Sequence, residues 1–385
     1  MHFGGGGSPL ENFVAWPEAT RNSLGREIAA CVWQKAVATT MAPLTRSGSL
    51  ALTLLGGTRA MSCAPAPHIT TPLVRSAFLS SKLGSEVFLK MDCLQPSGSF
   101  KLRGIGATVA AAQRSGASGV VSSSGGNAGL ATAHAAAALG LRCTVVLPST
   151  TPDAVRAKLE DEYGASVVVF GDVWDEANVE AERLAEESGG ALVHPFEGEE
   201  TWRGHATVVE EVDAQLREAG APPMDALVTC VGGGGLLMGL LRGLAAKERA
   251  QPVTVVAAET AGADSFAHSM AARKPLPLPG GITSIAKSLG ATTPSAAVLA
   301  AALDYGHVVP HVVSDAAAVA ACAALANERR VLVEPACGAA CAAVYGDPPP
   351  ALQGKACVVV EVCGGAVVSL PALRQWAADL GVAAF

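Results

Sequence analysis

Charged and aromatic side chains are scarce in this chain of 385 residues, at 16% and 4%, whereas half of the residues are hydrophobic. The net charge is −7 and no run of Lys or Arg occurs, which argues against nucleic acid as a partner. No apolar run reaches the length of a transmembrane helix, so we expect no membrane association. The remaining composition, rich in Ala, Val and Gly, is typical of helices packed on a parallel sheet.

The ten cysteines are scattered, and no two pairs of Cys or His have the spacing of a metal site. Cys337 and Cys341 would share a helix face, but no partner pair accompanies them. In a chain of this length the pattern predicts reduced core thiols of an intracellular protein and no disulfide framework.

Residues 1–60 differ from the rest of the chain. They open with four consecutive glycines, and residues 41–60 contain Arg46 and Arg59 but no acidic residue. This composition resembles a transit peptide, which would place the protein in a mitochondrion or plastid. The alternatives are a disordered tail, or translated upstream sequence with Met61 as the working start. We otherwise expect a cytoplasmic protein, and we expect a chain starting at Met61 to fold and to be active.

From His68 onward, strand-like and helix-like segments alternate, and several strands are continuous apolar runs. This combination predicts parallel sheets covered by helices on both faces. The expected strands are 87–89, 120–121, 143–147, 167–170, 191–194, 226–231, 253–258 and 356–362, and the expected helices are 105–113, 130–139, 152–162, 176–187, 201–218, 236–246, 316–326, 336–345 and 370–380.

The segment 96–104, Pro-Ser-Gly-Ser-Phe-Lys-Leu-Arg-Gly, joins an expected strand to an expected helix. Lys101 can therefore reach into a cleft, where desolvation lowers the pKa of an amine and frees its nucleophilic form. A Schiff base with a carbonyl cofactor is one interpretation, and simple binding of an anion beside a glycine turn is the other.

Four loops follow expected strands and lead toward helices: 97–101, 124–129, 232–235 and 363–365. In open α/β sheets such loops meet beyond the carboxyl ends of the strands. The four glycines from Gly232 to Gly235 offer unobstructed backbone amides to a phosphate. A Walker motif would need a lysine where Leu240 stands. A dinucleotide-binding Gly-x-Gly-x-x-Gly motif would need its last glycine where Leu237 or Met238 stands. Glu259, at the end of the next expected strand, imitates the ribose-binding acid of that motif, so the second motif is weakened but not excluded.

From His68 to its C-terminus the chain resembles the fold-type-II pyridoxal-phosphate enzymes, and among them the L-serine/L-threonine dehydratase group. The resemblance rests on five motifs in order, at 96–101, 124–129, 231–236, 334–338 and 362–365. It implies two open parallel-sheet domains with the cofactor in the cleft between them, as in the tryptophan synthase β-like fold. The implied division is an extension at 1–66, a large cofactor-binding domain at 67–103 and 197–385, and a small domain at 104–196.

The resemblance also assigns roles to the cofactor-binding residues. Lys101 would form the Schiff base and act as the catalytic base, while Phe100 would stack on the ring. Asn127 would bind the ring hydroxyl, and Cys363 would face the pyridine nitrogen. The phosphate would bind Gly232, Gly233, Gly234, Gly235 and Leu236.

Substrate and cation sites are implied in the same way. The substrate carboxylate would bind at Ser124, Gly125, Gly126 and Asn127, with Phe196 in a substrate-pocket segment or simply in the core. A monovalent cation, with potassium suited to hard oxygen ligands, would bind at Glu259, Ala263 and Ser265 together with backbone oxygens near Gly232, Leu289 and Ala291.

The implied activity is deamination by α,β-elimination, of L-serine to pyruvate and ammonia and of L-threonine to 2-oxobutanoate and ammonia, by a homodimer that acts on small amino acids. Serine racemase and other β-eliminating or β-replacing enzymes are the alternatives within the fold. A nucleotide-dependent oxidoreductase and an inactive binding module lie outside it. Racemases of this fold have serine at the position of Gly125, so we expect elimination with little D-serine.

Overall fold

The computed structural model describes residues 66–383, and the expectations for residues 1–60 lie outside this range. Two sheets are formed, with strand orders β1-β2-β10-β7-β8-β9 and β5-β4-β3-β6. The predicted α/β architecture is therefore observed. The strands are β1 Leu73–Arg75, β2 Glu86–Lys90, β3 Val120–Ser122, β4 Cys143–Leu147, β5 Ser166–Val169, β6 Ala191–Leu192, β7 Ala226–Cys230, β8 Thr254–Thr260, β9 Val308–Val313 and β10 Cys357–Glu361.

The six-stranded sheet is parallel except at one edge, where β1 pairs antiparallel with β2. Strand β10 lies between β2 and β7, so that Val359 is paired with Phe88 on one side and with Leu227 on the other. All five residues of β10 and all five of β7 are buried, as expected for continuous apolar strands with helices on both faces.

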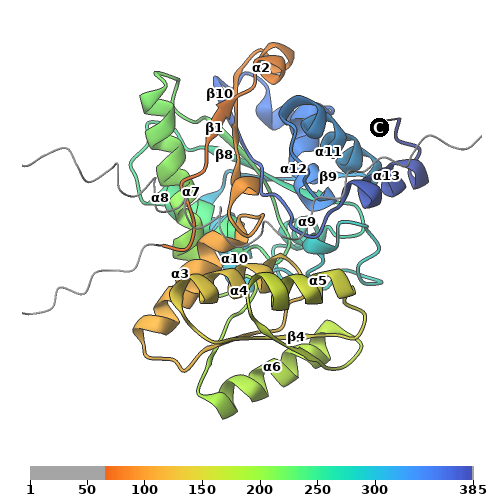
Figure 1. Ribbon diagram of the computed structural model, residues 1–385. Coiled ribbons are helices and arrows are strands. Elements are labelled where there is room, and N and C mark those ends of the chain that lie inside the picture. The colour runs from red at the N-terminus through yellow and green to blue at the C-terminus, as the bar shows by residue number, and fades with distance from the viewer. Residues whose placement is uncertain (1–65, 384–385) are drawn as a thin grey trace, which may run out of the picture. The chain divides into compact units, whose positions relative to one another are not determined.

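The helices lie on both faces of each sheet. In the larger part, α7 and α8 lie to one side of the strands and α11 and α12 to the other, and β4 of the smaller sheet lies between α4 and α6 (Figure 1). The helices are α2 Ala77–Leu83, α3 Lys101–Arg114, α4 Asn127–Leu139, α5 Asp153–Ala157 continued by a π-helical turn at Lys158–Glu162, α6 Trp174–Ser188, α7 Glu199–Glu218, α8 Gly235–Ala245, α9 Ser265–Ala272, α10 Ala296–Tyr305, α11 Asp315–Arg329, α12 Pro335–Tyr345 and α13 Leu370–Asp379. Within 66–383 no helix is both long and apolar enough to cross a membrane.

Five elements were not predicted: β1, α2, α9, α10 and β9. Strand β9 contains Pro310, which is compatible with a strand because β9 is the edge of the sheet and pairs only with β8. Helix α10 is rich in alanine and shows no clear apolar period, yet Ser295 caps it by accepting a hydrogen bond from the Val298 amide.

Helix α3, which begins at Lys101, is fixed by a buried charge network. The Arg103 guanidinium donates to both Asp92 oxygens at 2.6 and 2.7 Å and to Glu211 of α7 at 2.6 and 2.8 Å. Arg103 and Asp92 are fully buried, and Lys90 of β2 also binds Glu211. Because a planar guanidinium bonds two carboxylates in fixed geometry, the start of α3 is held in both position and rotation.

The same helix crosses α7 at Gly104 and Gly204. A β-carbon on Gly204 would overlap the Arg103 carbonyl oxygen, and one on Gly104 would overlap the His205 ring. The two backbones therefore approach each other at a distance that only glycine permits. This contact places Lys101 beside the segment that precedes α7.

Glu361, the last residue of β10, is fully buried beside the Asp92 carboxylate, to which its protonated form can donate, and within residues 66–383 no N–H or hydroxyl group donates to its carboxyl oxygens. Burial, together with the charge of Asp92, raises the pKa of Glu361 well above its ordinary value. The folded protein thus keeps a proton that the unfolded chain releases above its pKa of about 4.3. The resulting stability is fully present below that pH and is lost as the pH rises toward the folded-state pKa.

We expect Glu361→Gln to remove this dependence. Between pH 5 and pH 7 the unfolding free energy of the parent protein should fall relative to the variant, with a slope of up to about 1.4 kcal/mol per pH unit. Denaturant titrations across that range measure the slope. Glu186→Gln, at an exposed site of α6, is the control. Parallel curves for the parent and Glu361→Gln would contradict this assignment.

Candidate active site

Three of the four loops meet directly at the carboxyl ends of the strands. The Phe100 amide donates to the Cys363 carbonyl at 2.9 Å, and the Gly365 amide donates to the Gly98 carbonyl at 3.0 Å. The Ala366 amide donates to the Asn127 side chain at 2.8 Å. The glycine loop joins them through Cys230, whose sulfur lies 3.4 Å from that of Cys363. The predicted convergence is therefore observed.

Lys101 is the first residue of α3, and its amine donates to the Pro195 carbonyl at 2.6 Å. The amine lies 5.2 Å from the centre of the Phe100 ring. Burial lowers the pKa of Lys101 to about 8, although the nearby Cys230, Cys363 and Glu334 oppose the shift. At a pKa of about 8, roughly a tenth of the amine is unprotonated at pH 7, far more than for an ordinary lysine, and this is the form that a nucleophile or base requires.

Phe100 has a contact that the sequence did not indicate. Its ring packs on His205 of α7, with the ring centres 5.1 Å apart. His205 is fully buried, and neither ring nitrogen has a partner within the described range. Burial holds the pKa of His205 well below its ordinary value, so the imidazole is neutral and supports Phe100 as an apolar surface.

The glycine loop between β7 and α8 leaves no room for side chains. A β-carbon on Gly233 would lie 2.5 Å from the Phe196 ring, and one on Gly234 would lie 2.7 Å from Val298. Gly234 also has a φ of +95°, which favours glycine. Within residues 66–383, no backbone amide from Gly232 to Leu236 donates to an acceptor outside α8. Donors at the start of a helix, close to Lys101, form a suitable phosphate site.

Phe196 covers this loop. Its ring packs against Gly233, and its carbonyl accepts from the Trp202 indole at 2.9 Å. Pro195, the partner of Lys101, directly precedes it. Phe196 therefore connects the lysine to the glycine loop. It is half-buried, and its place in the substrate pocket stays a prediction.

Asn127, the first residue of α4, connects the small sheet to the large one. Its amide group donates to Glu334 at 2.7 Å and, more weakly, to Ser288 at 3.4 Å. Nearby, the Ser124 hydroxyl accepts from the Gly126 amide at 3.3 Å, which turns the loop 124–126 onto the start of α4. Small residues and free amides at a helix start suit a carboxylate ligand.

Glu334 was assigned no role in the sequence analysis, although its segment 334–338 carries part of the family resemblance. It is buried, and burial raises its pKa to about 7. Hydrogen bonds from Ser288 and Asn127 act in the opposite direction. Glu334 thereby fixes the orientation of the Asn127 side chain, because its carboxyl oxygen accepts from the amide nitrogen.

The expected cation ligands lie elsewhere, around the start of α9. The Glu259 carboxylate accepts from the Phe266 and Ala267 amides at 2.9 and 2.8 Å, so it caps that helix. The Ser265 hydroxyl donates to the Ala291 carbonyl at 2.7 Å, and Ala263 is buried. In the described part of the chain, no three His, Cys, Asp or Glu side chains form a metal cluster. Any cation here would depend on backbone oxygens.

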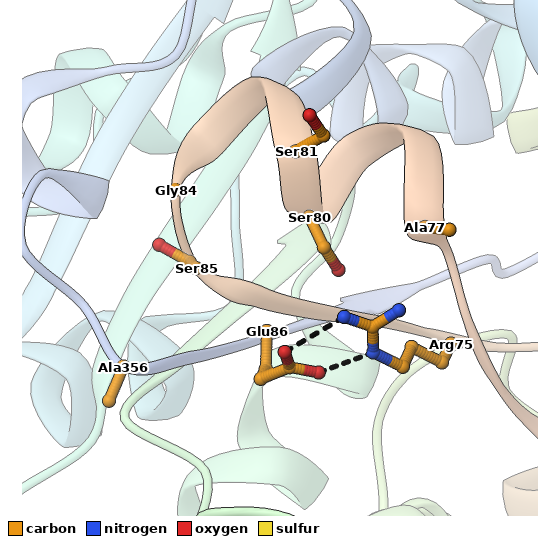
Figure 2. Close-up of a pocket in the computed structure, with 8 residues that line it drawn as sticks. All are labelled: Arg75, Ala77, Ser80, Ser81, Gly84, Ser85, Glu86 and Ala356. Carbon is orange, nitrogen blue, oxygen red and sulfur yellow. Dashed lines mark hydrogen bonds and ion pairs between the residues drawn. The ribbon is translucent and has the colours of Figure 1, made fainter.

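A separate surface hollow is lined by the start of β2 and by α2, and it contains the exposed ion pair between Arg75 and Glu86 (Figure 2). Glu86 and Ala356 lie at the amino ends of β2 and β10, opposite to the loops described above. Ligands of open α/β sheets bind at the carboxyl ends, so this hollow is not the active site.

The model of the family "Pyridoxal-phosphate dependent enzyme" matches residues 66–364, and the chain belongs to this family. It is 44% identical over 321 residues to the human protein "Serine dehydratase-like", covering 82% of this chain and 95% of the relative. It is 42% identical over 324 residues to the mouse "L-serine dehydratase/L-threonine deaminase", covering 82% and 96%. Among solved structures it matches a fungal L-serine ammonia-lyase from Rhizomucor miehei with a TM-score of 0.74 and 34% identity, covering 82% of this chain and all of the other. The resemblance inferred from the motifs and the fold class are thus confirmed.

The residues present fit the cofactor of this family. The glycine loop offers backbone donors where a β-carbon would overlap its neighbours, and Lys101 supplies an amine with a lowered pKa. The buried hydroxyls of Ser97 and Ser99 beside the lysine have no partner within residues 66–383. The phosphate, the aldehyde and the ring of the cofactor would therefore each meet protein groups of suitable chemistry in this site.

Proposed function

We propose that this protein deaminates L-serine to pyruvate and ammonia, and L-threonine to 2-oxobutanoate and ammonia, by eliminating the β-hydroxyl group as water and then adding water as the product is hydrolysed. The observation that carries the proposal is the position of Lys101, whose amine has a pKa of about 8, binds the Pro195 carbonyl and lies near Cys363 and Glu334. The relatives named for serine and threonine deamination support the same reaction.

The cofactor, when bound, supplies an aldehyde that condenses with amines and a ring that draws electrons from the α-carbon. Gly232–Leu236 would hold its phosphate, Phe100 its ring face, Asn127 its ring hydroxyl and Cys363 its pyridine nitrogen. Ser124, Gly125 and Gly126 would receive the substrate carboxylate at the start of α4.

Lys101 would take the α-proton at Nζ, because its lowered pKa leaves the amine free to accept a proton near neutral pH. Cys363 is a weak proton partner, since hydrogen bonds to Cys230 and Cys337, together with burial, raise the pKa of its thiol. A ring held by such a group withdraws fewer electrons than one held by a carboxylate, which suits elimination over a long-lived carbanion. Release of 2-oxo acid from both substrates, followed with a coupled reductase, tests the proposal. No release from either substrate would refute it.

Serine racemase is the second candidate, and Gly125 weighs against it. Racemisation needs an acid on the cofactor face opposite Lys101, and glycine has no group that can donate a proton there. A β-carbon at this position would lie 2.9 Å from a methyl group of Thr151 and 3.1 Å from Leu147, both of which are movable side chains. A serine can therefore be accommodated after a small displacement.

We expect the unmodified protein to form negligible D-serine and Gly125→Ser to gain some racemisation. Chiral chromatography of the products from L-serine, with pyruvate measured in parallel, makes the comparison. Gly125→Ala is the matched control, because it adds the same β-carbon without a hydroxyl. Comparable rates of D-serine and pyruvate formation by the unmodified protein would contradict the assignment.

The remaining expectations are part of the same proposal. They are the domain division at residues 103/104 and 196/197, a homodimer, a cytoplasmic location unless residues 1–60 act as a transit peptide, and a potassium ion near Glu259, Ala263 and Ser265. Burial raises the pKa of Glu259 to about 8, and a bound cation would favour its charged form. Activity measured as potassium is added, with lithium as the control, tests the cation site separately from the other expectations.

A further inference from the structure

Cys230 and Cys363 bring two thiols together from strands far apart in the sequence. Cys230 ends β7, and Cys363 follows β10, the neighbouring strand. Their sulfurs are 3.4 Å apart, and the two residues are 6% and 3% exposed. Val360 pairs with Val228, so Cys363 lies one residue past the position opposite Cys230, and the two sulfurs meet across this offset. Rotation of the side chains can bring the sulfurs to bonding distance.

The pair also lies next to a base. Both thiols affect the pKa of the Lys101 amine, whose pKa of about 8 makes it an acceptor for a thiol proton. Cys363 keeps its proton, because hydrogen bonding to Cys230 and Cys337 raises its pKa. The Cys363 thiol lies against the Cys230 sulfur, so Cys230 is the partner within its reach.

We propose that Cys230 and Cys363 form a disulfide when the cofactor is absent and a peroxide is present, and that the bound cofactor prevents this reaction. The cofactor would cover the sulfurs and engage Lys101, which removes both access and the base. This role of Cys230 goes beyond the proposed deaminase activity and does not depend on it.

The chemistry balances with hydrogen peroxide as the oxidant. The Cys230 thiol transfers its proton to Lys101, and its sulfur attacks the peroxide, breaking the O–O bond to give a sulfenic acid and hydroxide, which leaves as water with the proton from Lys101. The Cys363 sulfur then attacks the Cys230 sulfur, forming the S–S bond and breaking the S–O bond. The departing hydroxide takes the Cys363 proton as a second water. Two thiols are oxidised and one peroxide is reduced to two waters.

The test compares the full chain with and without cofactor. Each form is treated with hydrogen peroxide, unreacted thiols are alkylated under denaturing conditions, and the digest is analysed by mass spectrometry. In the apoprotein we expect one cross-link between the Cys230 and Cys363 peptides, loss of two free thiols per chain, and reversal by dithiothreitol. At pyridoxal phosphate of about 100 times its Kd, only about 1% of the chains is free, so formation should be about a hundredfold slower.

Single substitutions identify the partners. Cys230→Ser and Cys363→Ser should each abolish the cross-link, whereas Cys341→Ser, at another buried thiol, should leave it intact. Equal rates of cross-linking in the two forms would overturn the proposal, as would a cross-link from Cys363 to Cys337 or oxidation beyond sulfenic acid without any cross-link. None of these readouts requires turnover, so failure here is separate from failure of the deaminase assignment.

Discussion

Replacing Lys101 with alanine is expected to abolish 2-oxo acid release from L-serine, by at least about a thousandfold, because the base for the α-proton is lost. The fold should persist, since among the described residues the amine makes a single hydrogen bond, to the Pro195 carbonyl. The loss of unfolding free energy should therefore be about 1 kcal/mol or less. Steady-state turnover and denaturant unfolding measure the two effects.

Lys82→Ala is the matched control for this variant. Lys82 lies on α2, where its amine binds the carbonyls of Tyr345 and Gly346 at the protein surface, far from the loops of the site. It should leave turnover unchanged. Near-normal activity in Lys101→Ala would remove the basis of the mechanism.

The second large effect is expected at Gly129, in the first turn of α4. A β-carbon there would overlap the backbone carbonyl oxygen of Ser124 and lie 3.3 Å from Val145. A backbone oxygen cannot move aside as a flexible side chain can. Either α4 must shift or the loop 124–126 must open. We expect Gly129→Ala to cost about 3 kcal/mol of stability, and to weaken binding of the substrate carboxylate at the displaced loop.

Gly126→Ala provides the comparison within the same loop. Its β-carbon would meet only the Ser124 hydroxyl at 3.9 Å, and the φ of −106° is accessible to alanine. Its stability should lie within about 0.5 kcal/mol of the parent protein. Denaturant unfolding of both variants gives the difference, and the KM for L-serine reports on the loop. Equal stabilities of the two variants would show that the Ser124–Gly129 contact is not the constraint described here.

Much of this site could be predicted because strand and loop follow one another so regularly. The apolar runs at 226–231 and 356–362 identify central strands, and the rule that ligands bind at carboxyl ends then brings their loops together. The cofactor of the family, and the lysine proposed to react, followed from the resemblance of motifs within those loops. Edge elements such as β1 and β9 were missed because short or proline-containing strands lack the apolar signal on which the prediction relied.

The contacts between segments could not be predicted in the same way. Glu334 orients Asn127 across 207 residues of sequence, and Cys230 meets Cys363 across 133. His205 supports Phe100 although nothing in its helical pattern distinguishes it from a core residue. Such pairs are decided by the packing of strands and helices from distant segments, and the only sequence signal was a polar residue in an otherwise apolar run.

The central position of β10 also sets an order for folding during synthesis. The small sheet uses strands from a continuous stretch, β3 to β6, and can form as soon as that stretch has left the ribosome. The large sheet cannot, because β2 and β7 each need β10 as a neighbour, and β10 is translated after every other strand. Until then, the strands that lead into the lysine loop and the glycine loop, β2 and β7, each have an edge without its partner strand. A chaperone that shields such edges would therefore act on the two outer segments of the nascent chain and would not be needed for the middle one.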